Sequence, residues 1–266
     1  MTHYEVHAIK YGSHMLKSAQ AFLMEDPHDG PWPIFYYVWL VQGGGRNILI
    51  DTGFTAERAA KRGRTIERCP SEGLKTFGLS ASDIDTVILT HLHYDHAGNI
   101  PLFPNAEIYV QDKEVHFATG RYVRYPAVRL PFEADDVCEL VRQNYNGRVR
   151  FVDGDKELFE GFKVHLMGGH SRGLMCATVT TRRGRVVLAS DCAHFYDNLA
   201  LENPFPIIAD VPTQCETQER LIELAESPAH VVPGHDPKVM DLYPKHPDDE
   251  NTVDLTAELL GPSPLG

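Results

Sequence analysis

Hydrophobic residues along the chain fall into short runs that are rich in β-branched and aromatic side chains. Each run ends near glycine, proline, aspartate or asparagine, the residue types that favour turns. The runs predict β-strands at Tyr4–Ile9, Phe35–Val41, Asn47–Ile50, Thr86–Thr90, Glu107–Val110, Lys163–Leu166, Cys176–Thr181, Arg185–Ala189 and His230–Val232. Gln42–Asn47 and Arg182–Gly184 are expected to be hairpin turns, because each joins two such runs.

Between the runs, apolar residues recur at helical spacing. This pattern predicts helices over Gln111–Ala118, Asp135–Tyr145 and Glu216–Ala225, and Ser80–Asp83 supplies N-cap residues just before a strand. Strand pairs that alternate with single helices are typical of a layered α/β protein with sheets buried between helices. No repeat or linker interrupts the chain, so we expect one domain over residues 1–266, with residues 247–266 as a polar, weakly ordered peripheral tail.

Charge and composition narrow the function. The formal net charge is −12, from 25 Lys and Arg against 37 Asp and Glu, so no nucleic-acid partner is expected. No apolar run approaches the length of a membrane span and no basic-then-apolar leader follows Met1, so no membrane partner is expected. The five cysteines are odd in number and share no CxxC spacing, which is typical of a reduced, cytoplasmic protein.

The strongest chemical signal is the run His91-Leu92-His93-Tyr94-Asp95-His96, directly after a strand-like segment. In an extended loop, residues two apart point the same way, so His91 and His93 can aim two imidazoles at one ion. Asp95 and His96 follow where a turn can aim them at a second ion. Imidazole and carboxylate together suit zinc and similar metals.

Two ions need more ligands than this run supplies. Three further candidates stand at strand ends: His170 after Gly168-Gly169, Asp191 after the strand Arg185–Ala189, and His235 in a Pro-Gly turn. Glycines before His170 would let the chain approach an ion closely. Singly, each residue is more often structural, but their shared placement favours a metal site.

These segments resemble the metallo-β-lactamase superfamily in order and spacing. The matching segments are NILIDTG (Asn47–Gly53), HLHYDHAG (His91–Gly98), GGHSRG (Gly168–Gly173), LASDCAHFY (Leu188–Tyr196) and VPGHD (Val232–Asp236). The resemblance implies a four-layer αββα sandwich with a dinuclear site at one edge of the sheets. It also implies that His91, His93 and His170 hold the first metal, that Asp95, His96 and His235 hold the second, and that Asp191 bridges both. Asp51 is implied to support the ligand loop by hydrogen bonding, without touching metal.

The resemblance implies a hydrolase whose metal-activated hydroxide attacks a carbonyl, while Asp95 relays a proton to the leaving group. Two divalent ions are expected, with zinc as the default, although iron, manganese or cobalt would satisfy the same ligands. Within the superfamily, YVQDKE (Tyr109–Glu114), Pro33–Leu40 and Gly234-His235-Asp236 look like the N-acyl-homoserine lactone lactonases. A quorum-quenching lactonase acting on a small lactone or ester is therefore the leading hypothesis. The oligomeric state stays open, a homodimer included.

Several other functions of this superfamily fit the sequence less well than lactone hydrolysis. A β-lactamase of the commonest class would carry cysteine where Asp191 stands, and RNA-processing relatives would need a basic face. A thioesterase of the glyoxalase II kind shares the ligands, but no basic segment follows Glu216–Ala225 to hold glutathione. Another carboxylic ester hydrolase, or a non-catalytic binding protein with a vestigial site, remains an alternative.

One position departs from the better-known lactonases, which place a tyrosine three residues after the bridging aspartate. Here His194 stands at that position, with Tyr196 two residues later. Either side chain could donate a hydrogen bond to substrate, while the alternative for His194 is a solvent-facing loop. Asp29–Phe35 and Phe195–Ile208 could line the pocket or simply cover the core.

Overall fold

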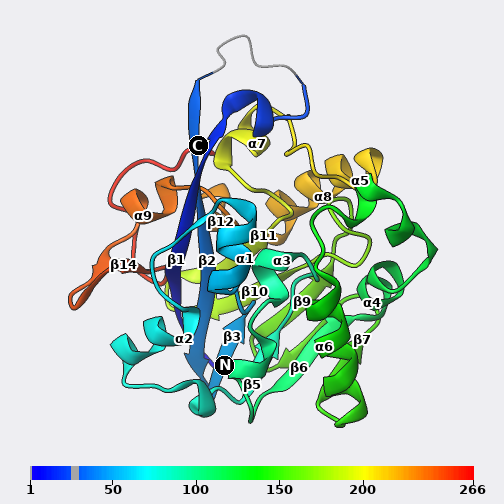
Figure 1. Cartoon of the computed structure of the whole chain (residues 1–266). Coiled ribbons are helices and arrows are strands. Elements are labelled where there is room, and N and C mark those ends of the chain that lie inside the picture. The colour runs from blue at the N-terminus through cyan, green and yellow to red at the C-terminus, as the bar shows by residue number, and fades with distance from the viewer. Residues whose placement is uncertain (1, 25–29) are drawn as a thin grey trace.

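The computed structural model describes residues 2–24 and 30–266. Two β-sheets lie face to face, and helices cover their outer sides (Figure 1). The larger sheet, of nine strands in the described ranges, runs in the order β13 (Lys245–His246), β14 (Asp249–Asp254), β1 (Glu5–Lys17), β2 (Pro31–Gly43), β3 (Arg46–Ile50), β5 (Thr86–Ile88), β6 (Glu107–Gln111) and β7 (Val149–Val152), and β4 (Thr65–Ile66) pairs with β1. The smaller sheet runs in the order β12 (Val231–Pro233), β11 (Gly184–Ser190), β10 (Met175–Thr181), β9 (Phe162–Leu166) and β8 (Lys156–Phe159).

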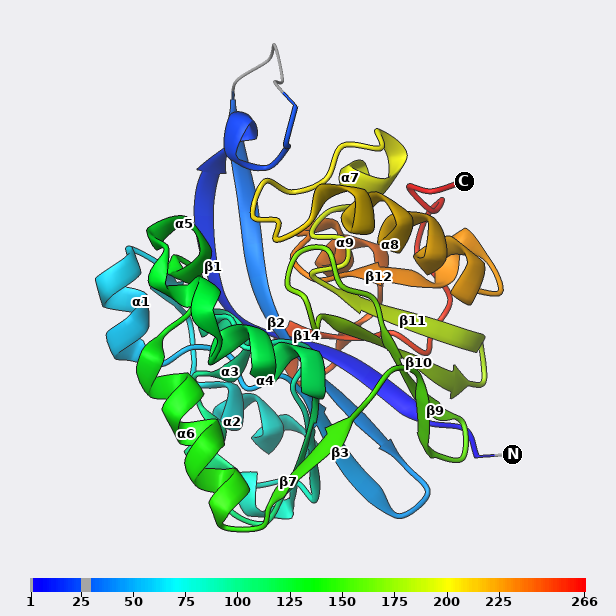
Figure 2. The same ribbon diagram turned by 90° about the vertical axis from the view of Figure 1, so that its right-hand side faces the viewer.

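Helices lie on both sides of this pair of sheets. The α-helices are α1 (Ala56–Arg62), α2 (Pro70–Gly73), α3 (Tyr94–Ala97), α4 (Asp112–Ala118), α5 (Pro126–Arg129), α6 (Ala134–Tyr145), α7 (Tyr196–Ala200), α8 (Val211–Leu224) and α9 (Lys238–Leu242). Short 3-10 helices occur at Ser18–Gln20, Leu74–Phe77, Ala81–Asp83, Ile100–Leu102, Arg121–Arg124 and Pro228–His230. In Figure 2, α4 and α6 lie on one side of the sheets and α8 on the other, which gives the expected αββα order.

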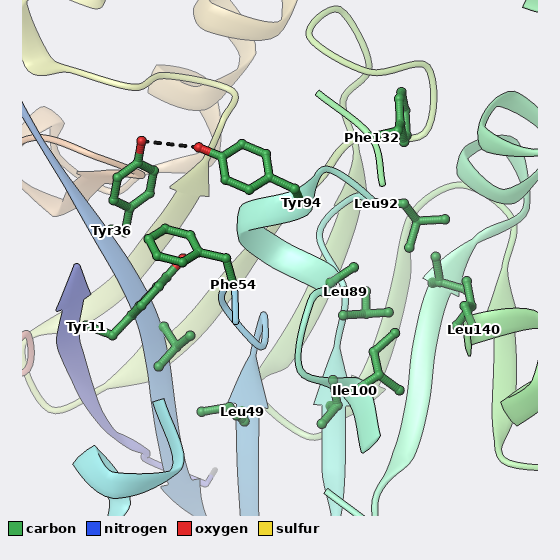
Figure 3. Packing of buried hydrophobic residues seen from close by; sticks show 14 of the residues in the cluster. Tyr11, Tyr36, Leu49, Phe54, Leu89, Leu92, Tyr94, Ile100, Phe132 and Leu140 are labelled. Carbon is green, nitrogen blue, oxygen red and sulfur yellow. Dashed lines mark hydrogen bonds between the residues drawn. The ribbon is translucent and has the colours of Figure 1, made fainter. Parts of the chain in front are cut away.

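Burial on both faces explains why the β2 sequence reads as one apolar run. Tyr37, Trp39 and Val41 pack between the two sheets, whereas Tyr36 and Val38 face the helices outside the larger sheet. Successive side chains of a strand point to opposite faces, so a strand covered on both sides needs apolar residues at every position. Figure 3 shows part of the outer cluster, where Leu89 and Ile100 meet Leu140 from α6.

All nine predicted strands are confirmed, as are both hairpin turns, with shifts of a few residues at their ends. Two predictions were too short. The first strand continues to Lys17, and α8 begins at Val211 instead of Glu216. Asp210 caps α8 by accepting a hydrogen bond from the Thr213 backbone, and a proline occupies the first turn. The capping aspartate and the proline after it are sequence signals for the start of a helix, and the prediction did not use them.

The prediction of a weakly ordered peripheral tail over residues 247–266 is wrong for its first part. β14 (Asp249–Asp254) pairs antiparallel with β1 inside the larger sheet, as Figure 1 shows. Val253 and Leu255 are fully buried in the layer between the sheets. Asp249 accepts hydrogen bonds from Arg68, Thr76 and Thr252. Backbone pairing and these polar contacts hold β14 in the sheet, so its sequence does not show the hydrophobic alternation that predicts a strand.

No helix in the described ranges has the length and apolar character needed to span a membrane.

Candidate metal centre

The run His91–His96 takes the conformation that its spacing suggests. β5 ends at Ile88, the chain bends at Thr90 and is extended again at the N-cap residue His93, and Asp95 and His96 lie on the short helix α3. All four ligand-type side chains are at most 9% exposed. The extended stretch and the helical turn therefore present two pairs of side chains to one buried space.

The other three candidates reach the same space from the smaller sheet. His170 follows Gly168 and Gly169, whose φ angles of 80° and 85° suit glycine. Asp191 and His235 follow β11 and β12, which are parallel neighbours with Ser190 opposite Pro233. Parallel pairing puts both strand ends at one edge of the sheet, so these two side chains meet there.

Asp191 lies at the centre of the cluster. Its Oδ1 lies 3.2 Å from His96 Nε2 and 3.1 Å from His235 Nε2, whereas its Oδ2 lies 3.1 Å from His170 Nε2 and 3.8 Å from His91 Nε2. The two carboxylate oxygens thus face two different groups of histidines. Although burial would raise the pKa of Asp191, the surrounding histidines, His194 foremost, hold it well below its usual range.

The remaining ligand candidates complete these two groups. His93 Nδ1 lies 2.9 Å from His170 Nε2, on the Oδ2 side. Asp95 Oδ2 lies 3.8 Å from His96 Nε2 and 4.0 Å from His235 Nε2, on the Oδ1 side. The structure therefore brings all seven predicted ligands together. Within three such groups, His91-His93-His170, His91-His96-Asp191 and Asp95-His96-His235, one ligand atom of each residue lies within 4.8 Å of the others.

The nitrogen atoms of this cluster fit divalent cations. Among the described residues, His91 Nε2 and His96 Nε2 are buried and find no hydrogen-bond partner, a costly state unless an ion binds there. Burial, with neighbouring histidines, lowers the pKa of His91 and His93 well below the usual value, so both imidazoles are neutral and can act as ligands. Against the effect of burial, Asp191 and Asp51 raise the pKa of His96 well above its usual value. The cluster thus favours added positive charge.

Neighbouring groups fix the orientation of the rings. Asp51 Oδ2 accepts a hydrogen bond from His96 Nδ1 at 2.7 Å, and its other oxygen accepts one from the Thr90 backbone. The His235 Nδ1 donates to the Phe35 carbonyl oxygen at 2.8 Å. In both rings this leaves Nε2 directed at Asp191. The expected supporting role of Asp51 is confirmed by these contacts.

Glu114 is a supporting residue that sequence reasoning missed, although it ends the lactonase-like segment Tyr109–Glu114. Its buried carboxylate accepts hydrogen bonds from the backbone nitrogen atoms of Leu92 and Gly173, each at 3.0 Å, and from the Ser171 hydroxyl. It therefore joins the His91–His96 loop to the loop that carries His170.

His194 belongs to the cluster, and the alternative of a solvent-facing loop residue is wrong. Its Nε2 lies 3.0 Å from Asp191 Oδ2, the ring stacks on Phe205 at a centroid distance of 3.8 Å, and only 3% of the residue is exposed. Tyr196 points elsewhere. It packs between the sheets beside Tyr37 and Tyr243, and it does not line the cavity at the cluster, so its predicted substrate contact is wrong for this structure.

A cavity of about 170 Å³ opens at the cluster. Ile34, Phe205 and Ile207 line it, so both apolar segments contribute to its wall, whereas Phe195 packs in the core and Asp29 lies outside the described residues. Sequence reasoning missed the apolar lining residues Leu16, Leu130 and Pro131. It also missed four lining residues with polar groups: Tyr36, Arg62, Arg64 and Tyr94. They come from β2, from α1 and the residues after it, and from α3, and no single spacing connects them.

A second cavity of about 500 Å³ adjoins the first and shares five lining residues with it: His93, Leu130, Pro131, His170 and Ile207. Its other lining residues are mostly apolar: Phe117, Tyr122, Ala127, Val128, Phe132, Arg172, Pro206, Ile208 and Ala209. An apolar chain attached to a group at the cluster could extend into this space.

Comparison with known proteins agrees with the fold. The chain is 29% identical over 189 residues to an N-acyl homoserine lactonase of Bacillus cereus, covering 65% of this chain and 69% of the relative. It is 30% identical over 196 residues to the N-acyl homoserine lactonase AttM of Azorhizobium caulinodans, covering 69% and 70%. The crystal structure of a quorum-quenching N-acyl homoserine lactone lactonase has a TM-score of 0.75 at 23% identity, over 90% of this chain and 94% of that one. The Metallo-beta-lactamase superfamily profile matches residues 31–235, and the chain belongs to this superfamily.

Proposed function

We propose that this chain is a quorum-quenching lactonase that holds two zinc ions and opens the ring of N-acyl homoserine lactones. One observation carries the proposal: seven ligand-type side chains meet at a cavity that continues directly into a larger apolar one. The names of the two relatives with 29% and 30% identity support this substrate class.

His91, His93 and His170 would hold one ion, Asp95, His96 and His235 the other, and Asp191 both. The unpartnered nitrogen atoms of His91 and His96 support this assignment. Five imidazoles and two carboxylates suit zinc. When bound, two such ions polarise a carbonyl group and activate water near neutral pH.

The chain itself would orient the substrate and handle its proton. Ring opening joins a water oxygen to the carbonyl carbon and breaks the bond from that carbon to the ring oxygen, which then needs a proton. Asp95 lines the cavity with its carboxylate and is the group that we assign to relay this proton. His194 also lines the cavity, and we assign it as a hydrogen-bond donor to the carbonyl oxygen.

The test is hydrolysis of a substrate panel by zinc-reconstituted protein, with metal content measured on the same samples. The panel contains N-hexanoyl and N-decanoyl homoserine lactones, plain γ- and δ-lactones, an aryl ester and a glutathione thioester. We expect fastest turnover of the homoserine lactones and two zinc ions per chain. His3→Ala, which removes an exposed histidine outside the cluster, should match the wild type. Cleavage of the thioester without turnover of any lactone would contradict the proposal.

We also propose a cytoplasmic location. The five cysteines are all free, which suits a reducing compartment. Cell fractionation followed by immunoblotting tests this location, and recovery of the protein outside the cytoplasm would contradict it.

A further inference from the structure

Two phenol groups and a guanidinium meet on one wall of the cavity at the cluster. The Tyr36 and Tyr94 hydroxyl groups face each other (Figure 3), and their oxygens lie 3.3 Å apart. Arg64 Nε donates to the Tyr94 oxygen at 3.2 Å. Tyr36, Arg64 and Tyr94 all line the cavity. Neither the ligand set nor the proton relay proposed above uses them.

Packing holds Tyr94 in a fixed position on this wall. Its ring stacks on Phe54 at a centroid distance of 5.8 Å, and the Arg62 guanidinium lies 4.0 Å from its centroid. The phenol oxygen of Tyr94 is a neutral acceptor for Arg64 Nε, so this hydrogen bond does not neutralise the charge of the guanidinium.

The backbone of Arg64 is equally well fixed. Helix α1 ends at Gly63 with a φ of 63°, and the Arg64 nitrogen donates to the Ala59 carbonyl oxygen at 2.8 Å. This pattern closes the last turn of a helix and sets the direction in which the chain leaves. The position of Arg64 beside the cavity thus follows from the end of α1.

The two arginines on this wall differ in their partners. Arg62 donates to the Glu133 carboxylate and to the Leu130 carbonyl oxygen. Arg64 is partly buried, yet within the described ranges its side chain donates only to Tyr94, and no carboxylate oxygen lies within ion-pair distance. Residues 2–24 and 30–266 provide no acceptor for its two terminal nitrogen atoms. A guanidinium in this state is suited to an oxygen acceptor from a ligand.

We propose that Arg64 is a specificity-determining residue. Its terminal nitrogen atoms donate to a carbonyl or carboxylate oxygen on the substituent beside the scissile carbonyl of the lactone. The proposal rests on the proposed lactonase activity and adds a substrate class. These are lactones in which the ring carbon next to the scissile carbonyl bears a substituent with a carbonyl or carboxylate oxygen. In an N-acyl homoserine lactone this oxygen belongs to the amide, and the rest of the acyl chain would extend into the apolar cavity.

The test compares three substrates with wild-type enzyme, Arg64→Met and Arg64→Lys. They are N-hexanoyl homoserine lactone, a γ-butyrolactone with a carboxylate on the same ring carbon, and plain γ-butyrolactone. The measured quantity is the preference, which is kcat/KM for a substituted lactone divided by kcat/KM for the plain one. We expect Arg64→Met to lower this preference about 10- to 100-fold, the range for loss of a hydrogen bond from a charged donor. Arg64→Lys keeps the charge but not the planar fork, so an intermediate preference is expected.

Arg182→Met removes an exposed arginine in the β10–β11 turn and should keep the wild-type preference. A larger fall for the carboxylate substrate identifies an anion as the partner of Arg64, and a larger fall for the amide substrate identifies a neutral carbonyl. An unchanged preference in Arg64→Met overturns the inference. Damage to the fold cannot imitate the expected fall in preference, because it would lower kcat/KM for all three substrates alike. If the wild-type enzyme opens none of the lactones, the proposed function itself is wrong.

Discussion

His194 and His170 share one oxygen of Asp191: their Nε2 atoms lie 3.0 and 3.1 Å from Asp191 Oδ2. An eighth potential ligand thus stands at the edge of the seven-residue set. Stacking on Phe205 holds the His194 ring in place. Its role is therefore separable from that of the other histidines by experiment.

Replacing His194 with alanine should lower kcat while leaving two metal ions bound. Seven ligands remain, but the donor assigned to the substrate carbonyl is lost, which typically costs about 10²- to 10³-fold. Steady-state kinetics and metal analysis of the same samples check this expectation. A fall to one ion per chain would instead assign His194 to the ligand set, and His116→Ala, an exposed histidine, provides the control.

Asp191→Ala should abolish hydrolysis and lower the metal content. Asp191 is the residue whose two oxygens face both groups of histidines, so no other side chain can replace it. Metal analysis after dialysis, together with lactone turnover, measures both effects. Two bound ions and a wild-type rate would show that the bridge is wrongly assigned.

Asp51→Asn should weaken metal binding about 10- to 100-fold without removing any ligand, the usual effect of losing a carboxylate behind a ligating histidine. The variant loses the negative charge that accepts the His96 Nδ1 hydrogen. Competition with a chromophoric zinc chelator gives the affinity. Asp153→Asn changes charge equally at an exposed position and should bind metal like the wild type, so equal affinity of all three proteins would refute the role of Asp51.

Ile207→Trp should shift substrate preference toward short acyl chains. Ile207 lines both the cavity at the cluster and the adjoining apolar cavity, so a larger side chain would narrow the passage between them. The ratio of kcat/KM for N-decanoyl to N-hexanoyl homoserine lactone should fall. The control is Ile222→Trp, at an exposed position of α8 away from both cavities, and it should leave the ratio unchanged. An unaltered ratio in Ile207→Trp would place the acyl chain elsewhere.

Asp249→Asn should destabilise the fold by about 1–3 kcal/mol at neutral pH, because the carboxylate accepts charged and neutral hydrogen bonds at a largely buried position. Burial alone would raise the pKa of Asp249, but Thr252 and Arg68 lower it. A carboxyl group with a lowered pKa in the folded state stabilises the protein above its unfolded pKa of about 3.9 and loses this contribution as pH falls below it. Urea unfolding of both metal-free proteins should therefore show a difference that shrinks below about pH 4. A constant difference would refute the electrostatic explanation.

The sequence predicted which side chains meet at the cluster because their positions depend on local rules. His91–His96 follows a buried strand, and Asp191 and His235 follow strands that end at one edge of a sheet. The orientation of Tyr196 was not predictable in this way. Its ring points between the sheets because α7 begins at that residue and Asp236 accepts a hydrogen bond from its backbone nitrogen.

The cavity wall formed by Tyr36, Arg64 and Tyr94 could not be predicted either. Tyr36, Arg64 and Tyr94 come from three parts of the chain, and their contacts depend on how β2, α1 and α3 pack.

The polar β14 sequence carries too few apolar residues for a periodic pattern, and its place in the sheet is set by backbone pairing and by the contacts of Asp249.

The position of β14 also has a consequence for synthesis of the chain. β1 is made more than 200 residues before β14, the strand that covers the His7–Ile9 part of its outer edge, whereas β4 covers Gly12 and Ser13. Until β14 is made, the His7–Ile9 part of β1 carries open backbone donors and acceptors, the kind of edge that recruits other chains into aggregates. A nascent or truncated chain that stops before Asp249 would keep this part of the edge exposed, so β14 serves as its closure.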